Sequence, residues 1–94
     1  MMKAIWKNKV IAESDETIVI DTFCYFPPES VNYKHLVKSN KHTECYWKGQ
    51  ASYYTINVDG KENEDAAWYY PEAKDKAKNI ENYIAFWRGV EVIE

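Results

Sequence analysis

The sequence has 94 residues, of which 46% are hydrophobic and 16% aromatic, and this is enough for one domain with a core of its own. Fifteen acidic and twelve basic residues give a formal net charge of −3, so no general attraction to nucleic-acid phosphates or anionic lipids is expected. No apolar stretch is long enough to cross a bilayer and the first residues do not resemble a secretory signal, which predicts a cytoplasmic protein with neither a membrane nor nucleic acid as a partner.

The chain contains no repeat, low-complexity tract or linker, so residues 1–94 are expected to form a single domain. Its two cysteines are Cys24 and Cys45. Because thiols stay reduced in the cytoplasm, we expect both to be free.

The first half of the sequence predicts short antiparallel strands. Polar breaks arrive at hairpin intervals and β-branched residues are frequent between them, as is typical of such strands. The expected strands cover residues 3–7, 10–14 and 17–26, with a turn at Asn8-Lys9 after the first and a stop at Pro27-Pro28 after the third. Residues 29–41 fit no period and are expected to be irregular, with one helical turn around residues 32–36.

The clearest hairpin of the sequence lies in the second half. Residues 51–58 and 61–70 have strand character and flank Asp59-Gly60. Both residues of this pair readily adopt the positive φ angles of a type I′ turn, whose twist matches that of the flanking strands. The sequence therefore predicts a two-residue hairpin here.

A helix is expected over residues 71–81. Pro71 is tolerated in a first helical turn, and Asn82 suits the left-handed position just past a helix end. A last strand is expected over residues 83–94. Together these elements predict a mainly β fold of the α+β type, a small antiparallel domain with one helix before the last strand.

Four segments point to a known family. They are YFPPESV (25 to 31), TECYWKGQASYY (43 to 54), DAAWYYP (65 to 71) and YIAFW (83 to 87). In this order and spacing the sequence resembles, over essentially its whole length, the bacterial and fungal family called domain of unknown function (DUF) 427. The resemblance implies a tent-like or barrel-like, mainly β domain with C-x-W-K-G and A-A-W-x-Y as signature motifs. It implies no established activity, although the family is sometimes labelled nucleotidyltransferase-like.

Cys45 is the one candidate for a catalytic residue. A thiolate is a strong nucleophile, and His42 and Lys48 are close enough in sequence to activate it. Burial as a structural thiol is the alternative, and on an extended strand Lys48 would point away from the sulfur. The cysteines and histidines match no zinc spacing, and no D-x-D motif or glycine-rich loop occurs, so we predict neither a metal nor a cofactor.

A ligand site is predicted from the cations and aromatic side chains of the signature motifs. The candidate contacts are Trp47, Lys48, Tyr54, Trp68, Tyr70 and Arg88. The two cations would hold an anionic group, the two indoles would sandwich a planar group, and one of the phenols would donate a hydrogen bond. Burial in the core is the alternative for several of these aromatic residues.

The leading hypothesis is therefore that the domain binds a small anionic or nucleotide-like ligand in an aromatic-lined pocket, and whether it catalyses a reaction stays open. One alternative is an interaction or scaffold module whose exposed aromatic patch binds a partner protein or a second copy, giving a homo-oligomer. The other is a thiol-dependent enzyme that uses Cys45. Convergence of the motif side chains on a concavity would favour the first hypothesis over the scaffold.

Overall fold

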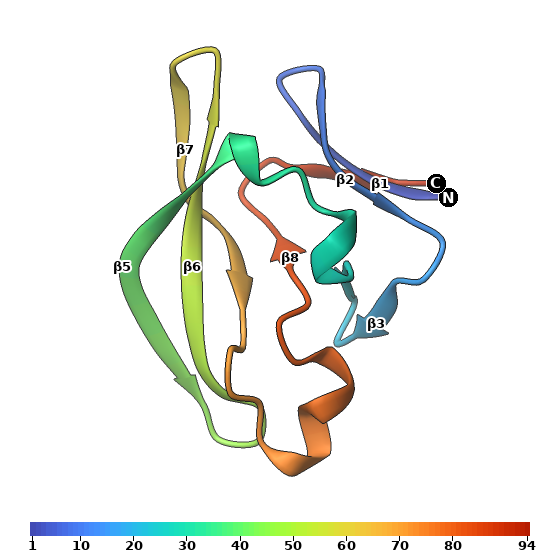
Figure 1. The fold of residues 1–94 in the computed structure, drawn as a ribbon, viewed down its shortest axis with the longest axis vertical. Helices are drawn as coiled ribbons and strands as arrows, with labels where there is room; N and C mark the ends of the chain where they lie inside the picture. The colour runs from blue at the N-terminus through green and yellow to red at the C-terminus, as the bar shows by residue number, and fades with distance from the viewer.

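The computed structural model describes all 94 residues and confirms a mainly β domain, built from three antiparallel sheets (Figure 1). One sheet has the strand order β2-β1-β9 and holds both ends of the chain, a second pairs β3 with β4, and a third has the order β5-β6-β7-β8. None of them closes into a barrel. The strands are β1 (Met2–Trp6), β2 (Lys9–Ser14), β3 (Ile18–Ile20), β4 (Phe23–Tyr25), β5 (Leu36–Cys45), β6 (Gly49–Val58), β7 (Lys61–Tyr69), β8 (Ala85–Phe86) and β9 (Glu91–Ile93).

Three 3₁₀ helices complete the fold: η1 (Pro28–Ser30), η2 (Tyr33–His35) and η3 (Asp75–Ile80). Helix η2 confirms the helical turn expected around residues 32–36, and the Asn32 side chain caps it. The expectation of irregular structure up to residue 41 is wrong, because β5 begins at Leu36 and pairs with β6. None of these helices has the length and apolar character needed to span a bilayer.

The predicted type I′ turn is confirmed at the tip of the β6–β7 hairpin, where Asp59 and Gly60 have φ angles of 52° and 80°. The first hairpin also turns through two positive φ angles, 49° at Lys7 and 64° at Asn8. This turn lies one residue earlier than expected.

Two strands that the sequence predicts as continuous are each divided by a turn. The expected strand over residues 17–26 is wrong, because Asp21 and Thr22, with φ angles of 51° and 70°, fold it into the β3–β4 hairpin. The expected last strand is also wrong. Positive φ angles at Arg88 and Gly89 separate β8 from β9, and these two strands belong to different sheets.

The helix expected over residues 71–81 is shorter than predicted and of a different type. Only Asp75–Ile80 is helical, as the 3₁₀ helix η3. The backbone N–H of Lys74 donates to the carbonyl of Lys48 at 3.0 Å, so the chain before η3 is held against the β5–β6 turn and does not wind into an α-helix. Asn82 has the expected left-handed conformation, with a φ angle of 65°. The side chains of Ala73, Ala77 and Ile80 are buried and form the apolar face of this segment.

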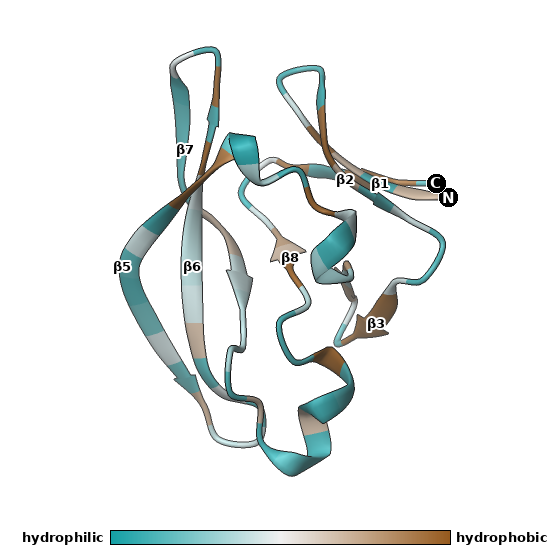
Figure 2. Cartoon of the chain, viewed as in Figure 1, coloured by the Kyte–Doolittle hydropathy of each residue, from teal (hydrophilic) through white to brown (hydrophobic).

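The core consists of two hydrophobic clusters. The first cluster lies between the three-stranded sheet and the part of the four-stranded sheet near the β6–β7 hairpin. The second cluster lies at the other end of that sheet, against β4 and η3, where hydrophobic positions alternate with hydrophilic ones along η3 (Figure 2). The first cluster contains Ala4, Ile11, Ala12, Phe26, Val31, Ile56, Val58, Ala66, Ala67, Ile84 and Phe86. The second contains Tyr25, Ala51, Tyr53, Trp68, Tyr70, Ala73, Ala77, Ile80 and Ala85.

Candidate functional site

A pocket of about 220 Å³ opens beside the second cluster, and we call it the aromatic pocket. Six of its eight lining residues are hydrophobic, and the other two carry opposite charges. Such a lining, mostly apolar with a few polar groups, is typical of small-molecule sites. The lining residues are Asp21, Phe23, Tyr25, Lys48, Tyr53, Trp68, Tyr70 and Trp87.

Contacts between rings hold the walls of the aromatic pocket in place. The Trp68 ring meets those of Phe23 and Trp87 edge to face, with centroids 4.9 Å and 5.7 Å away. Its indole N–H donates to the hydroxyl of Tyr25 at 3.3 Å. The Trp87 indole N–H donates to the carbonyl of Asp65 at 2.6 Å. Because neighbouring rings and hydrogen bonds fix these side chains, the pocket is formed without a ligand.

Lys48 places a charge in this aromatic surrounding and is only 7% exposed. Its ammonium nitrogen lies 5.0 Å from the ring centroid of Trp47 and 5.8 Å and 5.9 Å from those of Tyr25 and Tyr70. Its ionic partner is the Asp21 carboxylate at 3.3 Å, whose side chain is 69% exposed. An ammonium has three N–H donors, so two of them have no acceptor in the protein.

The β5–β6 turn carries Lys48 into the pocket. Because β5 ends at Cys45 and β6 begins at Gly49, the residues between them are not extended. Lys48 turns inward, while Tyr46 is 89% exposed. Gly49 has a φ angle of 114°, and a Cβ atom there would lie 3.1 Å from the carbonyl oxygen of Glu72. Only glycine fits both this conformation and this close approach without strain.

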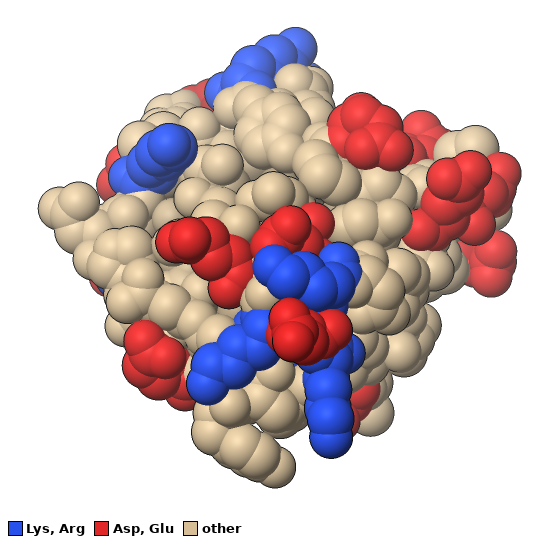
Figure 3. Space-filling view, turned by 60° about the horizontal axis from the view of Figure 1, so that its bottom comes forward, with Lys and Arg blue, Asp and Glu red and all other residues tan.

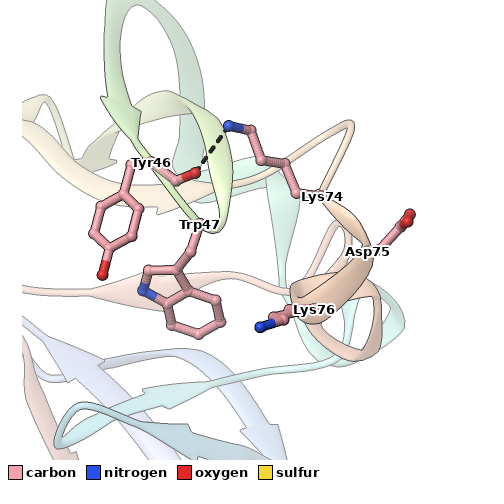
Figure 4. Close-up of a pocket in the computed structure, with 5 residues that line it drawn as sticks. All are labelled: Tyr46, Trp47, Lys74, Asp75 and Lys76. Carbon is pink, nitrogen blue, oxygen red and sulfur yellow. Dashed lines mark hydrogen bonds between the residues drawn. The ribbon is translucent and has the colours of Figure 1, made fainter.

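A second, more open hollow of about 490 Å³ borders the same turn, and we call it the lysine hollow (Figure 4). The Lys74 ammonium donates to the carbonyl of Tyr46 at 2.8 Å, which ties η3 to the turn. In Figure 4 the Lys76 side chain is directed toward the Trp47 ring, whereas Asp75 points away from it. The lining residues are Tyr46, Trp47, Lys74, Asp75 and Lys76.

Three of the predicted ligand contacts, Lys48, Trp68 and Tyr70, line the aromatic pocket. Trp47 lies beside it, with its ring over the Lys48 ammonium, and lines the lysine hollow. Burial, together with the neighbouring phenol of Tyr25, raises the pKa of Tyr70. The Tyr70 hydroxyl is therefore neutral at ordinary pH and can donate a hydrogen bond.

The other two predicted ligand contacts lie elsewhere. Tyr54 packs against the first cluster and stacks on Tyr69, with ring centroids 4.9 Å apart. Burial and the Tyr69 phenol raise the pKa of Tyr54 to about 12. Arg88 is exposed and donates to the carbonyl of Glu64 at 3.0 Å. Its guanidinium lies 4.7 Å from the ring centroid of Trp87, so it contacts a wall residue without lining the pocket.

The two cysteines are free and lie against different clusters. Cys45 is half-buried against the second cluster, and Cys24 packs against the first. The Nδ1 atom of His42 is hydrogen-bonded to Ser52 Oγ at 3.2 Å, and no hydrogen bond joins the His42 ring to the Cys45 thiol. No group of three or more His, Cys, Asp or Glu side chains is arranged to hold a metal ion.

Five of the residues that line the aromatic pocket are not predicted from the sequence: Asp21, Phe23, Tyr25, Tyr53 and Trp87. Asp21 and Phe23 reach the pocket through the turn that divides the expected strand over residues 17–26. A left-handed threonine in that turn is uncommon, so composition gives little sign of it. The aspartate before the threonine is the one turn-type residue that marks the position.

Comparisons with known proteins agree with the signature motifs. No curated protein matches the chain. The model of the family described as "Domain of unknown function (DUF427)" matches residues 1–94. Because this match covers the entire chain, the protein belongs to the DUF427 family.

Proposed function

We propose that this domain binds a small, anionic, nucleotide-like ligand and takes the planar group of that ligand into the aromatic pocket. The observation that carries the proposal is the Lys48–Asp21 pair, which faces a hollow otherwise lined by aromatic rings. A pocket with this lining offers stacking surfaces together with one donor and one acceptor.

The two charged groups suit the edge of a nitrogen heterocycle. Such an edge presents hydrogen-bond donors and acceptors side by side, as nucleobases do. The Lys48 ammonium donates and the Asp21 carboxylate accepts, while the Trp68 and Trp87 rings offer apolar contact to a planar group. Tyr70 supplies a neutral hydroxyl in the same pocket.

The ion pair does not block entry of the ligand. The Asp21 carboxylate is 69% exposed, so water solvates it when it turns away from the pocket, whereas the buried Lys48 ammonium needs an acceptor in its place. An acceptor group of the ligand can therefore replace part of the contact between Lys48 and Asp21. The convergence of aromatic side chains on a concavity also favours this proposal over a scaffold module with a flat aromatic patch.

The test is a binding titration of the protein with adenosine, cytidine and their monophosphates. Tryptophan fluorescence and the melting temperature are followed in a Trp6→Phe background, which removes the indole that packs against the first cluster. We expect at least one probe to quench the fluorescence. Lys48→Met should weaken the affinity for that probe by about tenfold or more, which is the loss expected for a hydrogen bond to a charged group.

Lys61→Met is the matched control, because Lys61 is exposed at the start of β7, away from the pocket. Lys48→Met is expected to fold, because the carboxylate that loses its partner, Asp21, is 69% exposed and stays solvated, so no buried charge is left unpaired. The proposal is wrong if none of these probes changes either signal, or if the two lysine variants lose affinity equally.

A further inference from the structure

We infer that the ligand carries a chain with two or more anionic groups, and that this chain leaves the aromatic pocket past Trp47 and ends in the lysine hollow, against Lys76. The inference rests on the proposed function and names the ligand class, a planar heterocycle with a phosphate or polycarboxylate chain.

The size of the aromatic pocket is the first argument. At about 220 Å³ it is smaller than the range of roughly 300 to 1,000 Å³ that is usual for drug-sized ligands. It therefore has room for one planar group, and the remainder of a nucleotide-sized ligand must extend outside it. The lysine hollow, with about 490 Å³, offers the space for that remainder.

Trp47 and Lys48 connect the two sites, because they are consecutive residues of one turn. The Trp47 ring lines the lysine hollow and at the same time lies 5.0 Å from the Lys48 ammonium, which lines the aromatic pocket. A ligand that contacts Lys48 and extends past this indole therefore reaches the lysine hollow. The exposed Tyr46 lies on the same side of the hollow as Trp47 (Figure 4).

Two hydrogen bonds fix the position of one site relative to the other. The Lys74 backbone N–H donates to the carbonyl of Lys48 at 3.0 Å, and the Lys74 ammonium donates to the carbonyl of Tyr46 at 2.8 Å. The β5–β6 turn and the start of η3 thus form one unit. A ligand that spans both sites does not have to order them, which lowers the entropic cost of binding.

The charges on this face support an anionic chain. Lysine side chains gather there, with carboxylates among them (Figure 3). Lys78 is paired with Glu81 at 2.9 Å, whereas Lys76 forms no ion pair and is exposed beside the hollow. Lys74 keeps two of its N–H donors after contacting Tyr46. Lys76 is therefore the free cation that an anionic group would meet.

The experiment compares adenosine, adenosine monophosphate and adenosine triphosphate as probes, in magnesium-free buffer at low ionic strength. The proteins are wild type, Lys76→Glu and the matched charge reversal Lys61→Glu. We expect wild type to bind the triphosphate more tightly than the monophosphate. Lys76→Glu should weaken triphosphate binding by about fivefold or more, as estimated from exposed ion pairs and the conversion of free energy into affinity. Adenosine binding should stay unchanged.

The Lys61→Glu variant alters the net charge equally, so any loss that both variants share reflects general electrostatics. The inference is overturned if Lys76→Glu and Lys61→Glu weaken triphosphate binding to the same extent, or if the triphosphate binds no better than the monophosphate. In either case the proposed function stands as long as adenosine still binds and Lys48→Met weakens its binding more than Lys61→Met does. If no probe binds wild type, the proposed function fails and this inference fails with it.

Discussion

Lys48 is almost completely buried, and its single ionic partner, Asp21, is largely exposed. Desolvation makes such a position costly for an ammonium, and three aromatic rings offset part of this cost through cation–π attraction of about 0.5 to 2 kcal/mol each. A buried ion is seldom needed for stability, because well-packed apolar residues of similar volume are often equally stabilising or more so, and stability alone therefore gives no reason for a lysine. The ammonium is thus better explained by what it can bind.

The phenol of Tyr54 gives a prediction on pH dependence. Its pKa is raised from 10 to about 12 in the folded protein, chiefly by burial. Between pH 10 and pH 12 an unfolded chain has lost this proton while the folded chain retains it. The stability contributed by the neutral, partly buried phenol is therefore fully present below pH 10 and is lost as the pH rises toward 12. We expect the free energy of unfolding, measured by urea denaturation, to fall across this interval.

A spectroscopic titration of phenolate absorbance checks the assignment. The protein has eight tyrosines, and those with raised pKa values should ionise later than the others. Tyr54→Phe should remove one group from the late class and leave the early class unchanged. Loss of a group from the early class would contradict the buried stacking of Tyr54 on Tyr69.

The turn between β5 and β6 is the element that positions both candidate sites, and Gly49 is its most constrained residue. In Gly49→Ala the new methyl group would combine an unfavourable positive φ with a contact to the Glu72 carbonyl oxygen at 3.1 Å. We expect a loss of about 2 to 3 kcal/mol in the free energy of unfolding, from backbone strain and overpacking together. Urea denaturation measures this loss, and binding of any ligand of the aromatic pocket should weaken with it.

Gly60→Ala provides the control for that prediction. Gly60 also has a positive φ angle, 80°, but a Cβ atom there would have nothing within 4 Å. Its substitution should cost about 1 kcal/mol, from the left-handed conformation alone. Equal losses in the two variants would mean that the close approach of Glu72 contributes nothing, and the account of the turn would be wrong.

The turns of this fold differ in how clearly the sequence predicts them. Asp59-Gly60 marks its hairpin because both residues accept positive φ angles, and the structure confirms it. Asp21-Thr22 also has two positive φ angles, but its second residue is β-branched, so the sequence predicts a continuous strand there. The turn at Arg88-Gly89 is also not predicted, because the apolar residues on both sides of it favour a continuous strand.

The candidate site was predicted only where its residues belong to the signature motifs C-x-W-K-G and A-A-W-x-Y. The signature motifs contain Trp47, Lys48, Trp68 and Tyr70, and the structure places them in or beside the aromatic pocket. Asp21 comes from 27 residues before Lys48, through a turn that was not predicted. Contacts of this kind depend on tertiary packing, so one sequence without relatives does not reveal them.

At the scale of the molecule, the two hydrophobic clusters share their strands. β6 contributes Tyr53 to the second cluster and Ile56 to the first, and β7 contributes Trp68 and Ala67 in the same way. Neither cluster can lose its strands without disrupting the other. The pocket, which borders the second cluster only, therefore depends for its shape on packing at the far end of the sheet.

This sharing predicts that the domain unfolds as one cooperative unit. Ile11 is fully buried in the first cluster, and Ile11→Val should cost about 0.5 to 1.5 kcal/mol. Urea unfolding is followed by far-UV circular dichroism and, in the Trp6→Phe background, by the fluorescence of the indoles in and around the second cluster. Both midpoints should coincide and should shift together in the variant. If the fluorescence midpoint stays fixed while the dichroism midpoint moves, the clusters unfold independently, and the aromatic pocket would be maintained by the second cluster alone.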